Sequence, residues 1–263
     1  MSTITTGDGQ LIDDRHFVEL DELGFTIVPE VIDRDLALSL RPAVQAALDR
    51  EHEAYGDRST KIPHLAVELL HYDPAFLDVL ESDKMHEVFA GVLGESCILY
   101  CFNSAIMPPR RHTAACEIHT DQTFYIPGYT ARVLMTLALD DFTEENGATY
   151  HYPGGHRLEQ PPSADDFYAK AIRTTRRAGD AVFFDCRDWH AGAVNNTDVT
   201  RYAIGVQAAR PFLKQRFDYP NWAMPEIEDR LSPRSRRFLG FDARPPASLD
   251  DYYLPPEERG YRA

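Results

Sequence analysis

The chain has 263 residues, 43% of them hydrophobic and 26% charged, so it can bury a core and has the composition of a soluble globular protein. It contains no run of about 18 apolar residues, the length that a membrane helix needs. Its 27 basic and 42 acidic residues give a net charge of −15, which repels nucleic-acid phosphates and anionic lipids. We therefore expect neither nucleic acid nor a membrane as a partner.

The N-terminus and the cysteines bear on the cellular compartment. The opening stretch MSTITTGDGQLIDDR lacks the basic and apolar regions of a signal peptide, which predicts a cytoplasmic protein. No two cysteines form a C-x-x-C pair, so a zinc ribbon or a thioredoxin-like motif is excluded. We expect the four to be free thiols: Cys97, Cys101, Cys116 and Cys186.

The N-terminal third is predicted to be largely helical. Residues 1–14 are polar, and we expect them to be disordered. Residues 24–31, GFTIVPEV, predict a short strand. Residues 33–56 predict a helix with a kink at Pro42, and residues 72–94 predict two short helices.

After Gly94 the pattern changes to short segments that are rich in β-branched and aromatic residues, such as CILYCFNSAIM and ARVLMTLALDD. Turn signals such as MPPRR, EENGA and YPGGH separate them. This pattern predicts a mainly β protein in which an antiparallel jelly roll, a cupin-like double-stranded β-helix, lies behind a helical layer. We expect residues 211–263 to form an irregular wrap over this core, within a single domain that spans residues 1–263.

The segment EIHTDQTFY contains a histidine and an aspartate, His119 and Asp121, that point to the same face of an extended chain. A third partner is expected on a later strand. His190 is the best candidate, because the apolar segment DAVFF leads to it. Two histidines and one carboxylate form the facial triad that binds non-haem Fe(II) and leaves positions open for substrate and dioxygen.

Eleven residues after His190 lies Arg201, in the mostly apolar segment TRYAIGVQ. A buried arginine is costly unless an anion neutralises it. A carboxylate co-substrate would provide that anion through a bidentate pair.

These residues, together with the segments LALDDFTEENGATYHYPGGHR and RAGDAVFFDCRDWHAGAVNNTDVTRYAIGVQ, resemble the phytanoyl-CoA dioxygenase family of Fe(II)/2-oxoglutarate-dependent dioxygenases. The resemblance covers most of residues 15–210. One departure is Gly155, where the family often has serine, and we interpret it as a minor variation of a turn. The resemblance implies that His119, Asp121 and His190 bind iron.

The same resemblance implies that Arg201 binds the distal carboxylate of 2-oxoglutarate. Thr136 matches a position that assists this carboxylate, and Asn103 is expected to contact the end of the co-substrate that chelates the metal. Tyr125 and Trp189 flank the ligands and are expected to line the substrate pocket. Three other histidines, His112, His151 and His156, are predicted to be loop or turn residues and not ligands.

The implied activity is oxygenation of a C–H bond in a small polar molecule, with Fe(II), 2-oxoglutarate and dioxygen. An intact Asp121 favours oxygenation over halogenation, because halogenases of this fold lack the carboxylate. The negative charge is compatible with an amine-bearing substrate, such as an aminoglycoside-type sugar in natural-product biosynthesis. Cyclisation, desaturation and epimerisation stay open as outcomes, and so does the oligomeric state. Two alternatives also stay open: a catalytically silent small-molecule binder and a non-redox, metal-dependent isomerase on the same barrel.

Overall fold

The computed structural model describes residues 11–56, 64–222 and 225–259. The prediction of disorder for residues 1–14 concerns mainly residues 1–10, which lie outside the described residues. Leu11 and Ile12 donate their backbone N–H groups to the carboxylate of Glu87. None of the described helices has the length and the apolar character needed to cross a bilayer.

The helices of the first third follow the sequence signals closely. The predicted helix over residues 33–56 is divided at Leu40, and Pro42 lies in the first turn of the second part, where its missing N–H group is not needed. The second of the two helices predicted within residues 72–94 is α5 (Asp83–Leu93). Ser82 caps it by accepting a hydrogen bond from Met85 N. The helices are α1 (Asp14–Glu22), α2 (Arg34–Ser39), α3 (Arg41–Tyr55), η2 (Leu69–His71), η3 (Pro74–Phe76), α4 (Leu77–Leu80) and α5 (Asp83–Leu93).

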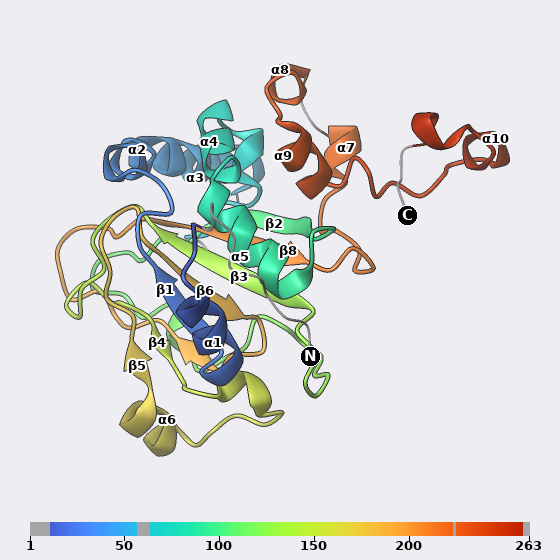
Figure 1. The fold of residues 1–263 in the computed structure, drawn as a ribbon. Coiled ribbons are helices and arrows are strands. Elements are labelled where there is room, and N and C mark those ends of the chain that lie inside the picture. The colour runs from blue at the N-terminus through green and yellow to red at the C-terminus, as the bar shows by residue number, and fades with distance from the viewer. Residues whose placement is uncertain (1–10, 57–63, 223–224, 260–263) are drawn as a thin grey trace.

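Two antiparallel sheets follow. The five-stranded sheet has the order β1-β6-β3-β8-β2, and the three-stranded sheet has the order β5-β4-β7. Helices α3–α5 lie on one side of the larger sheet, and β4, β5 and α6 (Ala164–Lys170) lie on the other (Figure 1). The strands are β1 (Phe25–Val28), β2 (Ile98–Ser104), β3 (Arg132–Ala138), β4 (Tyr150–His151), β5 (Ile172–Arg173), β6 (Ala181–Asp185), β7 (His190–Ala191) and β8 (Ala203–Ala209).

The prediction of antiparallel sheets with a helical layer is therefore confirmed. The prediction of a mainly β protein was too strong, because the described helices contain more residues than the strands, which makes this a mixed α and β structure. Two further short helices, η4 (Ala114–Cys116) and η5 (Gly155–Arg157), lie in the connections between strands. All four cysteines are buried and free, as expected.

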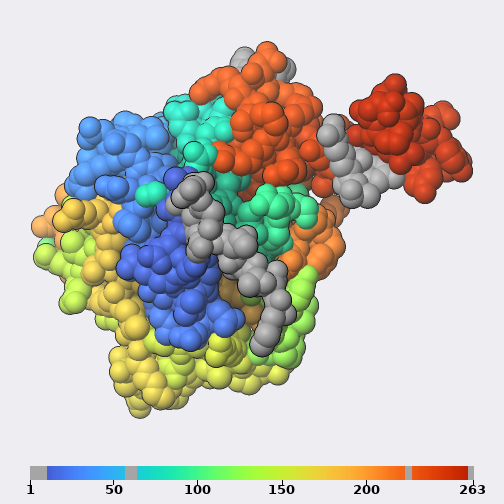
Figure 2. All heavy atoms as spheres, in the orientation of Figure 1, coloured from blue at the N-terminus to red at the C-terminus, as the bar shows by residue number. Residues whose placement is uncertain are grey.

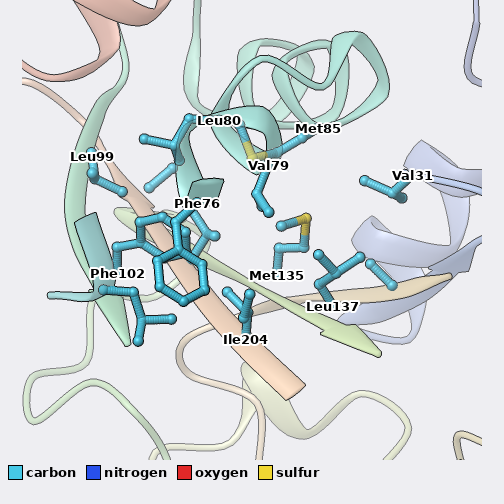
Figure 3. Close-up of a cluster of buried hydrophobic side chains, with 14 of the residues drawn as sticks. Val31, Phe76, Val79, Leu80, Met85, Leu99, Phe102, Met135, Leu137 and Ile204 are labelled. Carbon is cyan, nitrogen blue, oxygen red and sulfur yellow. The ribbon is translucent and has the colours of Figure 1, made fainter. Parts of the chain in front are cut away.

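The two faces of the larger sheet differ in chemistry. On β3 and β8 the alternate residues Met135, Leu137 and Ile204 belong to the main apolar core. They pack with Phe76, Val79, Leu80 and Met85 from the helical layer (Figure 3). We call the opposite face of this sheet, which is turned away from these helices, the inner face. It carries the residues of the other parity: Arg132, Leu134, Thr136 and Ala138 on β3, and Ala203, Gly205, Gln207 and Ala209 on β8.

The C-terminal segment contains short helices and reaches back to the first third of the chain. The hydroxyl of Tyr219 donates to the buried carboxylate of Glu68 at 2.5 Å, and Ser235 donates to Leu80 O at 3.1 Å. Helix α10 (Leu249–Tyr252) stands away from the body of the molecule (Figure 1, Figure 2). The helices are α7 (Tyr219–Trp222), α8 (Pro225–Glu228), α9 (Pro233–Phe238), α10 (Leu249–Tyr252) and η6 (Pro256–Glu258).

Candidate metal centre

Three side chains that the sequence singled out converge at one end of the inner face. One possible ligand atom from each of His119, Asp121 and His190 lies within 4.8 Å of those of the other two. The two histidines face each other across an isolated antiparallel bridge, with reciprocal backbone hydrogen bonds of 3.0 Å. Nε2 of His190 lies 3.6 Å from Oδ2 of Asp121. Strand pairing therefore brings together residues that are about seventy positions apart in the sequence.

Both imidazole rings are oriented by the same kind of contact. Nδ1 of His119 donates to Glu117 O at 2.8 Å, and Nδ1 of His190 donates to Asp188 O at 3.0 Å. Because a carbonyl only accepts, each Nδ1 carries a proton, and in the neutral form of either ring the lone pair is on Nε2. Burial lowers the pKa of His190 to about 4, with a further contribution from His119, so the ring is neutral near pH 7.

The backbone of Asp121 is held by a residue that the sequence did not indicate. Nη2 of Arg132 donates to the backbone carbonyl of Asp121 at 2.7 Å. The Arg132 guanidinium itself lies 4.6 Å from the ring centroid of Tyr100 and donates to Gln207. Arg132 stands at the first position of β3, with its side chain on the inner face. An arginine at the start of an apolar strand was the available signal, but its partner is fixed only by the fold.

Arg201 lies on the inner face, two residues before Ala203. It is 5% exposed, and its Nη1 donates to the carbonyl of Gly147, while Nε has no hydrogen-bond partner in the protein. Burial lowers the pKa of Arg201 to about 9, and the nearby carboxylate of Asp140 opposes this shift only in part, since no ion pair with Arg201 forms among the described residues. The predicted shortage of a counter-charge around Arg201 is therefore present, while its role in binding a co-substrate stays a prediction.

Thr136 and Asn103 lie on either side of Gly205, their common partner in the strand register. A Cβ built at Gly205 would lie 3.6 Å from Leu134 Cδ1 and 3.8 Å from Asn103 O, so this position could hold a Cβ at ordinary contact distances. The side chain of Asn103 is already engaged, since its Oδ1 accepts from Glu68 N at 3.2 Å. The predicted co-substrate contacts of Thr136 and Asn103 stay predictions. A glycine in the middle of a strand was the sequence signal for a position without a side chain on this face.

Tyr125 and Trp189 line one pocket with a volume of about 310 Å³. The Tyr125 hydroxyl donates to Arg157 O at 2.7 Å, and Trp189 Nε1 donates to Leu158 O at 3.0 Å. Thr120 and Gln122, on either side of Asp121, also line this pocket. The other lining residues are Thr123, Phe124, Leu158, Glu159, Gln160 and Arg187.

The three remaining histidines differ from one another. His112 is exposed in a loop and His156 lies in η5, as the turn signals predicted. The same prediction for His151 was wrong, because this residue is on β4 and fully buried. Its ring stacks on His190 with centroids 5.5 Å apart, and its Nδ1 lies 2.8 Å from Asp188 Oδ2.

Gly155 has a larger role than a minor variation of a turn. A Cβ at this position would lie 2.6 Å from Oδ1 of Asp188 and 2.9 Å from the backbone nitrogen of Trp189. The absence of a side chain lets η5 approach the segment that leads into His190. Gly155 thus contributes to the placement of a predicted metal ligand.

A sequence model of the family described as Phytanoyl-CoA dioxygenase (PhyH) matches residues 20–203, a range that includes the triad and Arg201. The chain belongs to the phytanoyl-CoA dioxygenase family. The protein is therefore a non-haem dioxygenase, as the resemblance implied. Several proteins that are similar to it in sequence are also named as dioxygenases.

Among these relatives, the uncharacterized protein Rv1501 of Mycobacterium tuberculosis is 30% identical over 92% of both chains. Dioxygenase sphC of Aspergillus fumigatus is 25% identical over 79% of this chain and 64% of its own. Two solved structures share the fold of this family member. The non-haem alpha ketoglutarate-dependent carbocyclase SnoK from nogalamycin biosynthesis has a TM-score of 0.61 at 22% identity, covering 85% of this chain and 92% of its own. AviO1 from Streptomyces viridochromogenes has a TM-score of 0.59 at 18% identity, covering 79% and 99%.

Proposed function

We propose that this protein is an Fe(II)- and 2-oxoglutarate-dependent oxygenase that acts on a C–H bond of a small polar molecule. The observation that carries the proposal is the convergence of His119, Asp121 and His190 on a face that also bears the unpaired Arg201. This donor set, two imidazoles and one carboxylate, is the one that suits non-haem Fe(II) with open positions.

The proposal extends to the architecture. The order of the strands in the two sheets supports a double-stranded β-helix, because the chain alternates between the sheets over much of its β region. One apolar cluster includes Leu20 near the N-terminus and Phe238 and Phe241 near the C-terminus. This shared core supports a single domain over the whole chain.

The residues of the site fit an iron ion and a dicarboxylate. Oδ2 of Asp121 is buried and has no hydrogen-bond partner in the protein, which a cation would remedy. With Nδ1 bound to a carbonyl, each imidazole in its neutral form offers the Nε2 lone pair to a metal. At the other end, Nε of Arg201 lacks an acceptor, and Gly205 places no side chain between its strand partners Thr136 and Asn103. A carboxylate would satisfy the arginine and fit beside the glycine.

Each part of the chain would then have a definable task. Bound Fe(II), with 2-oxoglutarate and dioxygen, supplies the oxidising power that an unactivated C–H bond requires. His119 and His190 bind as neutral donors whose orientation is fixed by Glu117 O and Asp188 O. Asp121 provides the negative charge at the metal. Arg201 binds the distal carboxylate of the co-substrate and sets its direction along the inner face.

The pocket beside the ligands supports a small polar substrate. Aromatic walls from Phe124, Tyr125 and Trp189 can stack on the apolar face of a ring, while Gln122 and Glu159 offer hydrogen-bond acceptors. The carboxylate of Glu159 favours an amine on the substrate, in agreement with the acidic surface. We propose an amine-bearing molecule of natural-product metabolism, with an aminoglycoside-type sugar as the first class to examine.

Anaerobic titration of the Fe(II)-loaded protein with 2-oxoglutarate tests the cofactors. We expect a weak visible charge-transfer band that is lost in Arg201→Ala and in His190→Ala, and retained in a matched control, Arg177→Ala, whose side chain is exposed. Iron binding without this band would contradict the proposal and favour a non-redox metal site. Binding of polyamine sugars, compared with neutral analogues, tests the substrate class, and equal or absent binding would end that part of the proposal.

A further inference from the structure

A buried phenylalanine lies between two buried arginines beside the predicted co-substrate site. The guanidinium carbon of Arg176 is 3.7 Å from the ring centroid of Phe142, and that of Arg201 is 3.9 Å from the same centroid. Two planar guanidinium groups this close to one centroid would overlap on a single side of the ring, so they lie on opposite sides. All three side chains are less than a tenth exposed.

The hydrogen bonds of the two arginines leave their charges without a counter-ion. Arg176 donates from Nη1 to Thr174 O at 2.8 Å and to its hydroxyl at 3.3 Å, and from Nη2 to Thr136 O at 3.3 Å. Arg201 donates to the carbonyl of Gly147. These acceptors are neutral, and Nε of each arginine has no partner. Neither residue forms an ion pair within the ranges that the structure describes.

Two like charges on either side of one ring disfavour each other. Burial lowers the pKa of Arg176 well below its usual range, and the charge of Arg201 lowers it further. The distant carboxylate of Asp180 opposes this shift only as the last contribution. Such a pair is costly unless an anion binds beside it. Under the proposed function, a dicarboxylate co-substrate would bring that anion, because its distal carboxylate would bind Arg201.

We propose that Arg176 is a positioning residue for the co-substrate: through Phe142 it fixes the Arg201 guanidinium, and its charge favours 2-oxo acids that carry a distal carboxylate. This inference rests on the proposed function. Arg176 also holds Thr136 through the backbone carbonyl, so it connects two residues that are expected to surround the distal carboxylate. Its charge acts across the thickness of one aromatic ring in a water-poor interior, where screening is weak.

The test compares two ligands and four proteins. The ligands are 2-oxoglutarate and 2-oxopentanoate, which has the same carbon chain but ends in a methyl group. Their dissociation constants are measured anaerobically on the Fe(II)-loaded protein, for the unchanged chain, Arg176→Met, Arg176→Lys and the control Arg177→Met. Arg177 is the exposed neighbour of Arg176 in the sequence. Circular dichroism and the iron content report whether each variant is folded and loaded.

We expect Arg176→Met to weaken 2-oxoglutarate binding roughly tenfold, the effect of removing one charge at several ångströms in a medium of intermediate dielectric. Binding of 2-oxopentanoate should change less than about twofold, since it has no distal charge. Arg176→Lys keeps the charge and should recover part of the loss, which also preserves the test if the methionine variant does not fold. Arg177→Met should behave as the unchanged protein.

Equal weakening of both ligands would overturn the inference, because it would mean that Arg176 only supports the fold. Unchanged affinity for both ligands would overturn it as well. Failure of the unchanged protein to bind 2-oxoglutarate would overturn the proposed function and this inference with it, whereas the first two results leave the proposed function intact.

Discussion

The two faces of the sheet that contains β3 and β8 separate stability from chemistry. On the face toward the helices, Met135, Leu137 and Ile204 are fully buried among other apolar side chains. On the side of the inner face lie the buried polar atoms that have no partner in the protein. Apart from Arg234 among the helices, the atoms of this kind in the described part of the chain belong to Asp121, Gln122, Arg132, His151, His156, Arg173, Arg176, Asp188 and Arg201.

Unpaired buried polar atoms cost free energy, so their concentration on one side requires an explanation. The apolar face can bear that cost, because each large side chain buried there contributes about 1.5–3 kcal/mol. We therefore expect substitutions on the inner face to change ligand affinity more than the free energy of unfolding. Substitutions on the face toward the helices should change the free energy of unfolding more than ligand affinity.

The largest expected effect is the loss of the metal in Asp121→Ala. Changes in the partners of metal ligands typically weaken binding about 10- to 100-fold, so removal of a ligand should weaken it by at least about 100-fold. The melting temperature of the metal-free protein should be retained, since the lost oxygen had no partner. Isothermal titration with Fe(II) under argon measures the first effect, and calorimetry measures the second. Asp165→Ala, on an exposed turn of α6, is the control. Undiminished affinity of Asp121→Ala for Fe(II) would contradict the assignment of ligand binding to the inner face.

Met135→Ala tests the other face. Met135 is 0% exposed and points toward α4 and α5 (Figure 3). We expect the free energy of unfolding to fall by about 2–5 kcal/mol because of the lost contacts and the cavity. Met135→Leu should cost less than about 1.5 kcal/mol. Urea unfolding measures both. The metal affinity of the folded variants should equal that of the unchanged protein, and a matching loss of metal would contradict the separation of the faces.

Glu68 offers a contrast to Asp121, because it is a buried carboxylate whose oxygens accept hydrogen bonds within the protein. Burial raises its pKa from 4.5 to about 7, although Tyr219 and Phe102 N donate to it. The folded state therefore binds this proton more tightly than the unfolded state. The resulting stability is present below about pH 4.5, is lost as the pH rises to 7, and is absent above it.

The variant Glu68→Gln should remove this dependence. The free energy of unfolding of the unchanged protein, minus that of the variant, should fall between pH 4.5 and pH 7 by about 3 kcal/mol at most. Urea unfolding at a series of pH values measures this difference. Parallel curves for the two proteins would show that Glu68 titrates normally in the folded state.

Gly205→Leu has the smallest expected effect. A leucine should project between Thr136 and Asn103 and weaken 2-oxoglutarate binding about tenfold, because overlap of its added methylene groups with a ligand should cost about as much as overpacking a core, roughly 1–3 kcal/mol. Gly205→Ala is the control, since a Cβ has its nearest neighbours at 3.6 and 3.8 Å. The visible charge-transfer band reports co-substrate binding. Equal affinities in the two variants would place the co-substrate elsewhere.

Much of the site could be predicted from the sequence because its signals are local. His119 and Asp121 share a face through their spacing on an extended chain, and apolar segments lead to His190 and Arg201. The antiparallel sheets and the helical layer follow from periodicity and turn residues. The boundary at Leu40 was missed as a helix end, because Pro42 was interpreted as a kink and not as a first-turn residue.

The sequence by itself thus predicted the family, the convergence of His119, Asp121 and His190, and a buried charge at Arg201. Only the tertiary structure decided that Arg132 holds Asp121, that His151 lies against His190, and that Arg176 and Arg201 share Phe142. The physical reason is that these contacts join segments far apart in the chain. Their geometry depends on strand register and on the packing of the two sheets, which local residue patterns do not encode.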